Sequence, residues 1–210
     1  MNSIFRRASL SALVVAGALW PLAGCAPLIV GGVAVMGGMV ASDRRTPGTV
    51  VEDEGIEIKA ASRIRDSLFE RAHVNVTSYN RQVLLTGEVP SAQDKQLVEK
   101  IVAGVENVRN IVNELEVLGN STLTQRSSDS LVTGRAKAAL VDASDLYANA
   151  FKIITERGTT YMMGRVTQRE AKRATDIISG TSGVQRVVRV LEIISEDELI
   201  RLQPPPAAKK

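Results

Sequence analysis

Two valine-rich stretches decide the fold: Val184-Gln185-Arg186-Val187-Val188-Arg189-Val190-Leu191-Glu192-Ile193 near the carboxyl end, and Val108-Arg109-Asn110-Ile111-Val112-Asn113-Glu114-Leu115-Glu116-Val117 earlier in the chain. Their apolar positions superpose without a gap. Upstream of each, a second match aligns Leu84-Leu85-Thr86-Gly87-Glu88-Val89 with Tyr161-Met162-Met163-Gly164-Arg165-Val166. Because self-similarity at a nearly constant offset is the signature of a repeat, we expect two copies of one structural unit.

The first copy is predicted to begin with a helix and a hairpin. Apolar residues four positions apart, Ala60, Ile64 and Leu68, indicate the buried face of a helix. Two short strands are then expected at 74–79 and 82–87, joined by the turn Asn80-Arg81. The second copy has the same elements: a helix marked by Val132, Ala136 and Leu140, strands at 151–155 and 159–164, and the turn Arg157-Gly158.

A second helix and a last strand complete each unit. Thr167 and Glu170 have the spacing of a capping box, in which each side chain satisfies a backbone N–H of the other residue. In the first copy, Ser91 and Asp94 open the corresponding helix. The valine-rich stretches supply the last strands. The order αββαβ predicts an α+β fold, with two tandem units that are each a three-stranded sheet covered on one face by two helices.

The repeated pattern resembles the BON domain. A strand ends in hydrophobic-x-Gly-x-Val, a capped helix follows, and Gly183-Val184-Gln185-Arg186-Val187-Val188 matches the start of the last strand. The first copy has Glu106-Asn107-Val108, with asparagine where the family's glycine stands. With its segment Asp43-Arg44-Arg45-Thr46 and its two units, the whole chain is similar to the dual-BON-domain outer-membrane lipoproteins. That resemblance implies phospholipid binding and a role in maintaining the outer membrane and cell envelope.

The amino end has the three parts of a secretory signal peptide. Arg6 and Arg7 are followed by an uncharged apolar stretch at 8–20, and Leu22-Ala23-Gly24-Cys25 closes it with small residues. This ending resembles the lipobox of bacterial lipoproteins, in which the chain is cut before the cysteine and fatty acyl chains such as palmitate are attached there. Two or three acyl chains anchor a protein stably, whereas one does not. We therefore expect Cys25 to be the lipidation site.

The residue after Cys25 predicts the membrane to which the protein is sorted, and the pattern along the chain predicts the domain boundaries. Ala26 stands where an aspartate would retain an enteric lipoprotein in the inner membrane, so the resemblance implies the outer membrane, facing the periplasm. The expected divisions are a signal peptide at 1–24, a lipidated segment and polar linker at 25–54, BON domains at 55–118 and 129–195, a linker at 119–128, and a largely disordered tail at 196–210.

The composition excludes several classes of function. Only 3% of the residues are aromatic, which argues against a base-stacking or sugar-binding platform, and a net charge of +3 is small for a nucleic-acid binder. No phosphate loop or nucleophile motif is present, so we expect no enzyme, no cofactor and no small-molecule substrate. His73 is the sole histidine, so no metal site is expected, and we interpret it as solvated or locally hydrogen-bonded.

The second copy is the more basic one and offers a candidate phospholipid contact. Residues 129–195 contain ten Lys and Arg against seven Asp and Glu, whereas 56–118 contain eight against nine. In the first helix of the second copy, Leu131, Arg135, Lys137 and Ala138 are predicted to form an outward face with an apolar tip and flanking cations. An alternative stays open, in which Leu131 packs under the linker between the domains.

Two functions therefore compete. The first is a non-enzymatic outer-membrane lipoprotein whose BON domains bind anionic phospholipid headgroups and support envelope integrity. The second is a periplasmic adaptor that binds an envelope protein partner, such as outer-membrane assembly or cell-wall remodelling machinery. The near-neutral first copy and the basic second copy would allow both.

Overall fold

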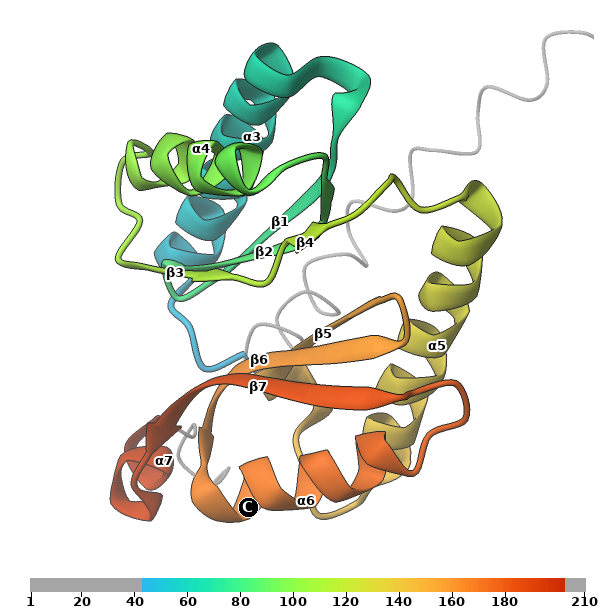
Figure 1. Cartoon of the computed structure of the whole chain (residues 1–210). Coiled ribbons are helices and arrows are strands. Elements are labelled where there is room, and N and C mark those ends of the chain that lie inside the picture. The colour runs from blue at the N-terminus through green and yellow to red at the C-terminus, as the bar shows by residue number, and fades with distance from the viewer. Residues whose placement is uncertain (1–42, 203–210) are drawn as a thin grey trace, which may run out of the picture. The chain divides into compact units, whose positions relative to one another are not determined.

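The structure, a computed structural model, describes residues 43–202, which belong to one compact unit (Figure 1). The signal peptide, the lipidation site Cys25, the sorting residue Ala26 and the apolar stretch 28–40 lie outside the described residues. Within 43–202, no helix is both long enough and apolar enough to cross a membrane.

The first unit has the expected order of elements. Strand β2 is central: β1 pairs with it antiparallel, and β3 and β4 both pair with it in parallel. Strands β3 and β4 are two parts of one interrupted last strand, since the Glu114 N–H between them still donates to the Leu85 carbonyl at 2.9 Å. The elements are α3 (Pro47–Leu68), the 3₁₀ turn η2 (Phe69–Arg71), β1 (His73–Tyr79), β2 (Gln82–Val89), α4 (Ala92–Ala103), β3 (Asn110–Asn113) and β4 (Glu116–Val117).

The second unit repeats this arrangement. Its sheet has the order β5-β6-β7, with β5 antiparallel and β7 parallel to the central β6. The predicted capping box is present, with the Thr167 hydroxyl and the Glu170 carboxylate each accepting from the other's backbone N–H. The α+β, αββαβ prediction is thus confirmed. The elements are α5 (Leu123–Asp142), η3 (Ala148–Ala150), β5 (Phe151–Glu156), β6 (Thr159–Thr167), α6 (Gln168–Ser179), β7 (Arg186–Ile194) and α7 (Glu196–Leu202).

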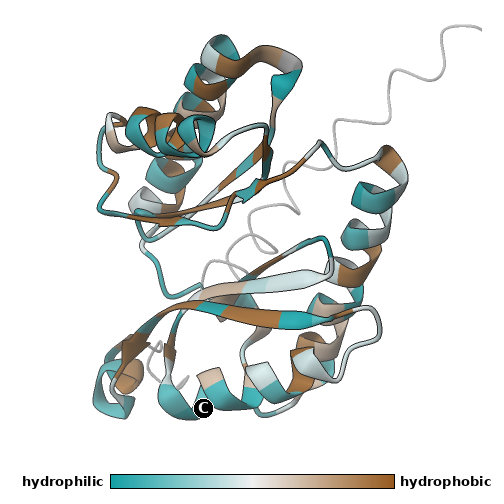
Figure 2. Ribbon diagram, in the orientation of Figure 1, coloured by the Kyte–Doolittle hydropathy of each residue, from teal (hydrophilic) through white to brown (hydrophobic). Residues whose placement is uncertain are grey.

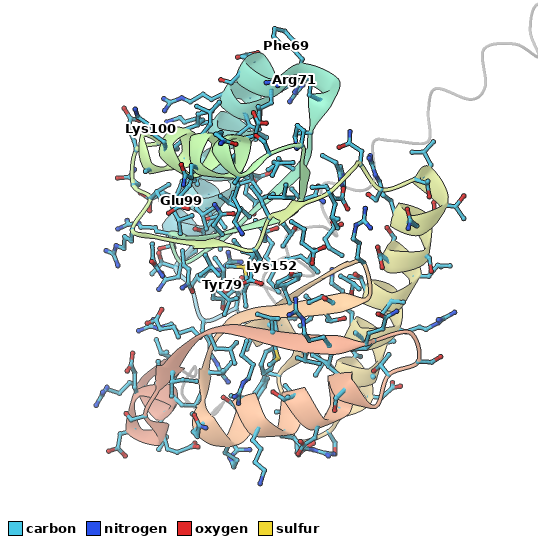
Figure 3. The ribbon with its side chains drawn as sticks, viewed as in Figure 1. Phe69, Arg71, Tyr79, Glu99, Lys100 and Lys152 are labelled. Carbon is cyan, nitrogen blue, oxygen red and sulfur yellow. The ribbon has the colours of Figure 1, made fainter. Side chains whose placement is uncertain are left out.

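Each sheet buries one face against its two helices, and the opposite faces of the two sheets meet. The first helix-covered core contains Ile64 and Leu85, and the second contains Leu140 and Met162. The core between the sheets draws on both units: Tyr79, Leu84, Tyr161, Met163 and Val190. Figure 3 shows Tyr79 and Lys152 in this region, where the Lys152 ammonium donates to the Ser78 carbonyl at 3.2 Å. The two domains therefore share a buried interface.

Three segments are more regular than expected. Helix α3 begins at Pro47, inside the segment expected as a polar linker up to residue 54: Thr46 caps the helix and proline is favoured in its first turn. Helix α5 likewise starts inside the linker predicted at 119–128, because Thr122 and Gln125 form a capping box. In the predicted tail, Glu196–Leu202 form α7, whose Leu199 is buried.

A buried aspartate holds the hairpin turn of each unit. Asp53 on α3 accepts from the N–H groups of Asn80 and Arg81 at 2.8 and 2.7 Å. In the second unit, Asp129 on α5 does the same for Arg157 and Gly158 at 2.9 and 3.0 Å; all four turn residues have positive φ. The carboxylates satisfy turn amides that point away from the strands and so fix each hairpin onto its first helix.

Candidate functional site

Helix α5 carries the candidate contact face. Its buried side, formed by Val132, Ala136 and Leu140, packs on the second sheet and leaves the opposite side to solvent. Since residues advance by about 100° along a helix, positions 131 and 138 fall on the side opposite this buried stripe. The helix therefore presents a long face to the surroundings of the protein.

The structure places all four predicted contact residues on the exposed part of this helix. Leu131 is 63% exposed, and Arg135, Lys137 and Ala138 also lie away from the buried stripe. An exposure of 63% does not fit the alternative in which Leu131 packs under the linker. Arg135 is held only loosely, with its Nη1 3.5 Å from the Ser182 carbonyl oxygen.

Two further apolar residues, which the sequence reasoning missed, extend the face to both ends of the helix. Leu123 is 79% exposed and Val141 is 69% exposed, and both fall within about 80° of Leu131 around the helix axis. The missed signal is the helical spacing 123, 131, 138 and 141, which runs opposite the buried stripe. Hydrophobic colour recurs among the hydrophilic stretches of α5 in Figure 2. We call Leu123, Leu131, Ala138 and Val141, with the flanking Arg135 and Lys137, the α5 face.

The charge on this part of the helix is mainly positive. Arg135 and Lys137 lie on opposite sides of the apolar stripe, at about +40° and −120° from Leu131. Asp129 does not offset them at the surface, because its carboxylate is buried and occupied by the turn amides. Asp142 is exposed, but it lies at the carboxyl end of the helix. An apolar stripe between cations is the arrangement by which amphipathic helices contact anionic lipid surfaces.

Comparison with known proteins identifies the class of the domains. Residues 52–119 and 128–195 each match the family model of the BON domain. The chain therefore belongs to the BON domain family and carries two tandem copies, as the sequence repeat predicted.

Two curated relatives span most of the chain. It is 36% identical over 183 residues to outer membrane lipoprotein DolP of Haemophilus influenzae, covering 86% of this chain and 94% of the relative. It is 32% identical over 154 residues to a 21 kDa hemolysin of Actinobacillus pleuropneumoniae, covering 72% of this chain and 79% of the relative. Among solved structures, the type III secretion protein CdsD of Chlamydia trachomatis covers 68% of this chain and 96% of its own, at 13% identity and a TM-score of 0.29, which supports no further argument.

Proposed function

We propose that this protein is a non-enzymatic outer-membrane lipoprotein whose second BON domain contacts anionic phospholipid through the α5 face. The lipid on Cys25 anchors the chain, and the domains face the periplasm and support the integrity of the envelope. The observation that carries the contact is the 63% exposure of Leu131 in an apolar stripe flanked by Arg135 and Lys137. The similarity to outer membrane lipoprotein DolP over most of both chains supports the location.

The α5 face is suited to a weak, charge-dependent membrane contact. Each cation near an anionic bilayer contributes about 1 kcal/mol and acts within a Debye length, about 10 Å at about 0.1 M salt. Leu131 adds apolar area that the protein itself leaves in water. A covalent anchor would keep the effective concentration of bilayer high, so a contact that is weak in free solution would suffice.

Vesicle sedimentation tests this proposal without the anchor. The compact unit 41–210 is mixed with vesicles of phosphatidylcholine alone, or of phosphatidylcholine with phosphatidylglycerol, at low and high salt. We expect salt-sensitive binding to the anionic vesicles alone, and we expect Leu131→Glu to abolish it. Ile58→Glu is the matched control, because Ile58 is 65% exposed on the first helix of the other domain. Binding that is unchanged by Leu131→Glu would refute the contact.

A second candidate function, docking of an envelope protein, is favoured by the first domain. Val51 and Ile58 are 70% and 65% exposed on α3, and Phe69 is 73% exposed directly after it. Figure 3 shows Phe69 beside Arg71 at this end of the first domain. Single exposed apolar residues are common, but three along one helix and its end form a surface suited to a protein partner. If 41–210 sediments with neither type of vesicle, this second function is preferred.

A further inference from the structure

His73 and Glu88 meet at the junction of the two domains. They are opposite each other in the β1–β2 pair, and His73 Nδ1 lies 3.1 Å from Glu88 Oε2. Gly87 makes this approach possible: its φ is +107°, and a Cβ at this position would lie 2.1 Å from the His73 carbonyl oxygen. The glycine of the BON pattern therefore brings the sole histidine of the chain against a carboxylate.

The two carboxylate oxygens of Glu88 have different hydrogen-bond partners. Its side chain is fully buried, and Oε1 accepts from Arg157 Nε of the second domain at 2.6 Å. Oε2 accepts from the N–H and the hydroxyl of Ser121, both at 3.1 Å, and faces the His73 ring. One oxygen is thus neutralised by an arginine, while the other faces an imidazole nitrogen.

Glu156 adds a third ligand-type side chain from the second domain. It ends strand β5 and accepts a hydrogen bond from the Asn75 amide of β1. Ligand atoms of His73, Glu88 and Glu156 all lie within 4.8 Å of one another. Glu156 therefore brings a carboxylate of the second domain close to His73 and Glu88 of the first.

Thr86 places an unsatisfied polar group on the same face of the sheet. Its hydroxyl is buried and, within the described part of the chain, has no hydrogen-bond partner. Because Thr86 is opposite Asn75 in the β1–β2 pair and two residues from Glu88, its side chain shares their face of the sheet. A cavity of about 480 Å³ is lined by His73, Asn75 and Glu156, with Asp129 and the cations Arg126 and Lys137 among its other lining side chains. A buried hydroxyl without a partner is unfavourable, so this face of the sheet has a polar group whose hydrogen-bonding capacity is unused.

We propose that His73 Nδ1, Glu88 Oε2 and a carboxylate oxygen of Glu156 bind a divalent metal ion of the zinc class between the two BON domains. One nitrogen and two oxygens form a donor set that zinc accepts, with bonds of about 2.0–2.2 Å. The 3.1 Å between His73 Nδ1 and Glu88 Oε2 is close to the spacing of two such ligands on one ion. The Glu156 carboxylate completes the set by rotation of its side chain.

Metal binding changes the protonation of the site. In the tautomer in which His73 Nδ1 carries a proton and donates it to Glu88, the ion replaces this proton, which is released to solvent. Any proton on Glu156 is released in the same step. Arg157 remains on Glu88 Oε1, and water occupies the coordination position toward the cavity. The ion joins β1 and β2 of the first domain to β5 of the second, so it stabilises the docked arrangement of the two domains.

Calorimetric titration of zinc chloride tests the proposal on the full chain. The protein is purified in detergent, stripped with EDTA and titrated at about pH 7.5, where deprotonated ligands favour binding. We expect one saturable site, and we expect His73→Ala and Glu156→Gln each to weaken it by at least about tenfold. Asp145→Asn is the matched control, since this exposed carboxylate of the same domain pairs with Arg173, away from the proposed site.

Two further measurements make the outcome decisive. Thermal unfolding should show that zinc raises the Tm of the wild-type chain by more than that of His73→Ala, while the far-ultraviolet circular dichroism of both variants confirms that they fold. Cobalt substituted for zinc should give the visible absorption of a low-symmetry site. The absence of saturable binding, or binding that is retained in both variants, overturns the proposal.

Discussion

Arg44 and Glu170 form a buried, bidentate ion pair that joins the segment before the first domain to the second domain. Arg44 Nη1 and Nη2 lie 2.8 and 2.6 Å from the two carboxylate oxygens, and the residues are 8% and 2% exposed. Arg44 also donates to the Arg165 carbonyl at 2.8 Å. The next residue, Arg45, contacts the first domain. Its Nη1 lies 2.9 Å from Asp53 Oδ2, and its Cζ lies 4.2 Å from the centroid of the Tyr79 ring. Adjacent arginines thus connect one segment to both BON domains.

Replacing Arg44 should destabilise the protein strongly. We expect Arg44→Ala to lower the free energy of unfolding by about 3–5 kcal/mol, because it leaves the Glu170 carboxylate buried without its partner. Urea unfolding followed by circular dichroism measures this. Arg173→Ala is the control: its pair with Asp145 is half exposed, and such pairs contribute at most about 1 kcal/mol. Equal losses in the two variants would mean that the buried pair has no special role.

The same pair should make stability sensitive to acid. Burial alone would raise the pKa of Glu170, but hydrogen bonds from Arg44 and the Thr167 N–H outweigh it and hold that pKa below its usual value of 4.5. A depressed pKa contributes stability that is present above the unfolded pKa and is lost as the pH falls through the folded one. Wild-type protein should therefore exceed Glu170→Gln in stability at about pH 7, with a gap that narrows below about pH 4.5. A gap that stays constant from neutral to strongly acidic pH would contradict this.

The features that sequence predicts correctly are those coded by neighbouring residues. The capping box of Thr167 and Glu170 spans three positions, and the turn Asn80-Arg81 is set by the strands on either side. The duplication strengthens these local signals, because each element has to occur twice. The exposure of Leu131, Arg135, Lys137 and Ala138 likewise follows from helical spacing, because the opposite stripe of α5 is buried; their contact with phospholipid stays a prediction.

The features that sequence misses depend on contacts between distant residues. In the sequence, Asp53 falls in the predicted polar linker. Its burial is explained by the N–H groups of Asn80 and Arg81, 27 and 28 positions away, which donate hydrogen bonds to its carboxylate. Pro47 also lies in the segment expected as a linker, and the cap that Thr46 provides explains why a helix begins there. Glu88 and Arg157 lie 69 positions apart, in different domains, and become partners only when the two sheets meet. For the same reason His73 looks isolated in the sequence.

Two glycines should respond to alanine in opposite directions. Gly87→Ala is expected to cost about 2–4 kcal/mol or more, since its φ is +107° and the new Cβ would overlap the His73 carbonyl. Gly134→Ala should stabilise by about 0.5–1 kcal/mol, because Gly134 lies inside α5 and nothing lies within 4 Å of the Cβ that alanine would add. Thermal unfolding of both variants tests the pair. Similar effects at the two sites would show that backbone conformation at Gly87 is unimportant.

The cations of the α5 face should determine the salt dependence of vesicle binding. At about 1 kcal/mol each, removing Arg135 and Lys137 by double substitution to glutamine should weaken binding of 41–210 to anionic vesicles by roughly 30-fold. The charge-matched control substitutes Lys172 and Arg173, which are exposed on α6 of the same domain. Raising the salt to about 1 M, where the Debye length is about 3 Å, should reduce wild-type binding far more than that of the Arg135/Lys137 variant. If the control variant loses as much affinity, net charge and not the α5 face governs binding.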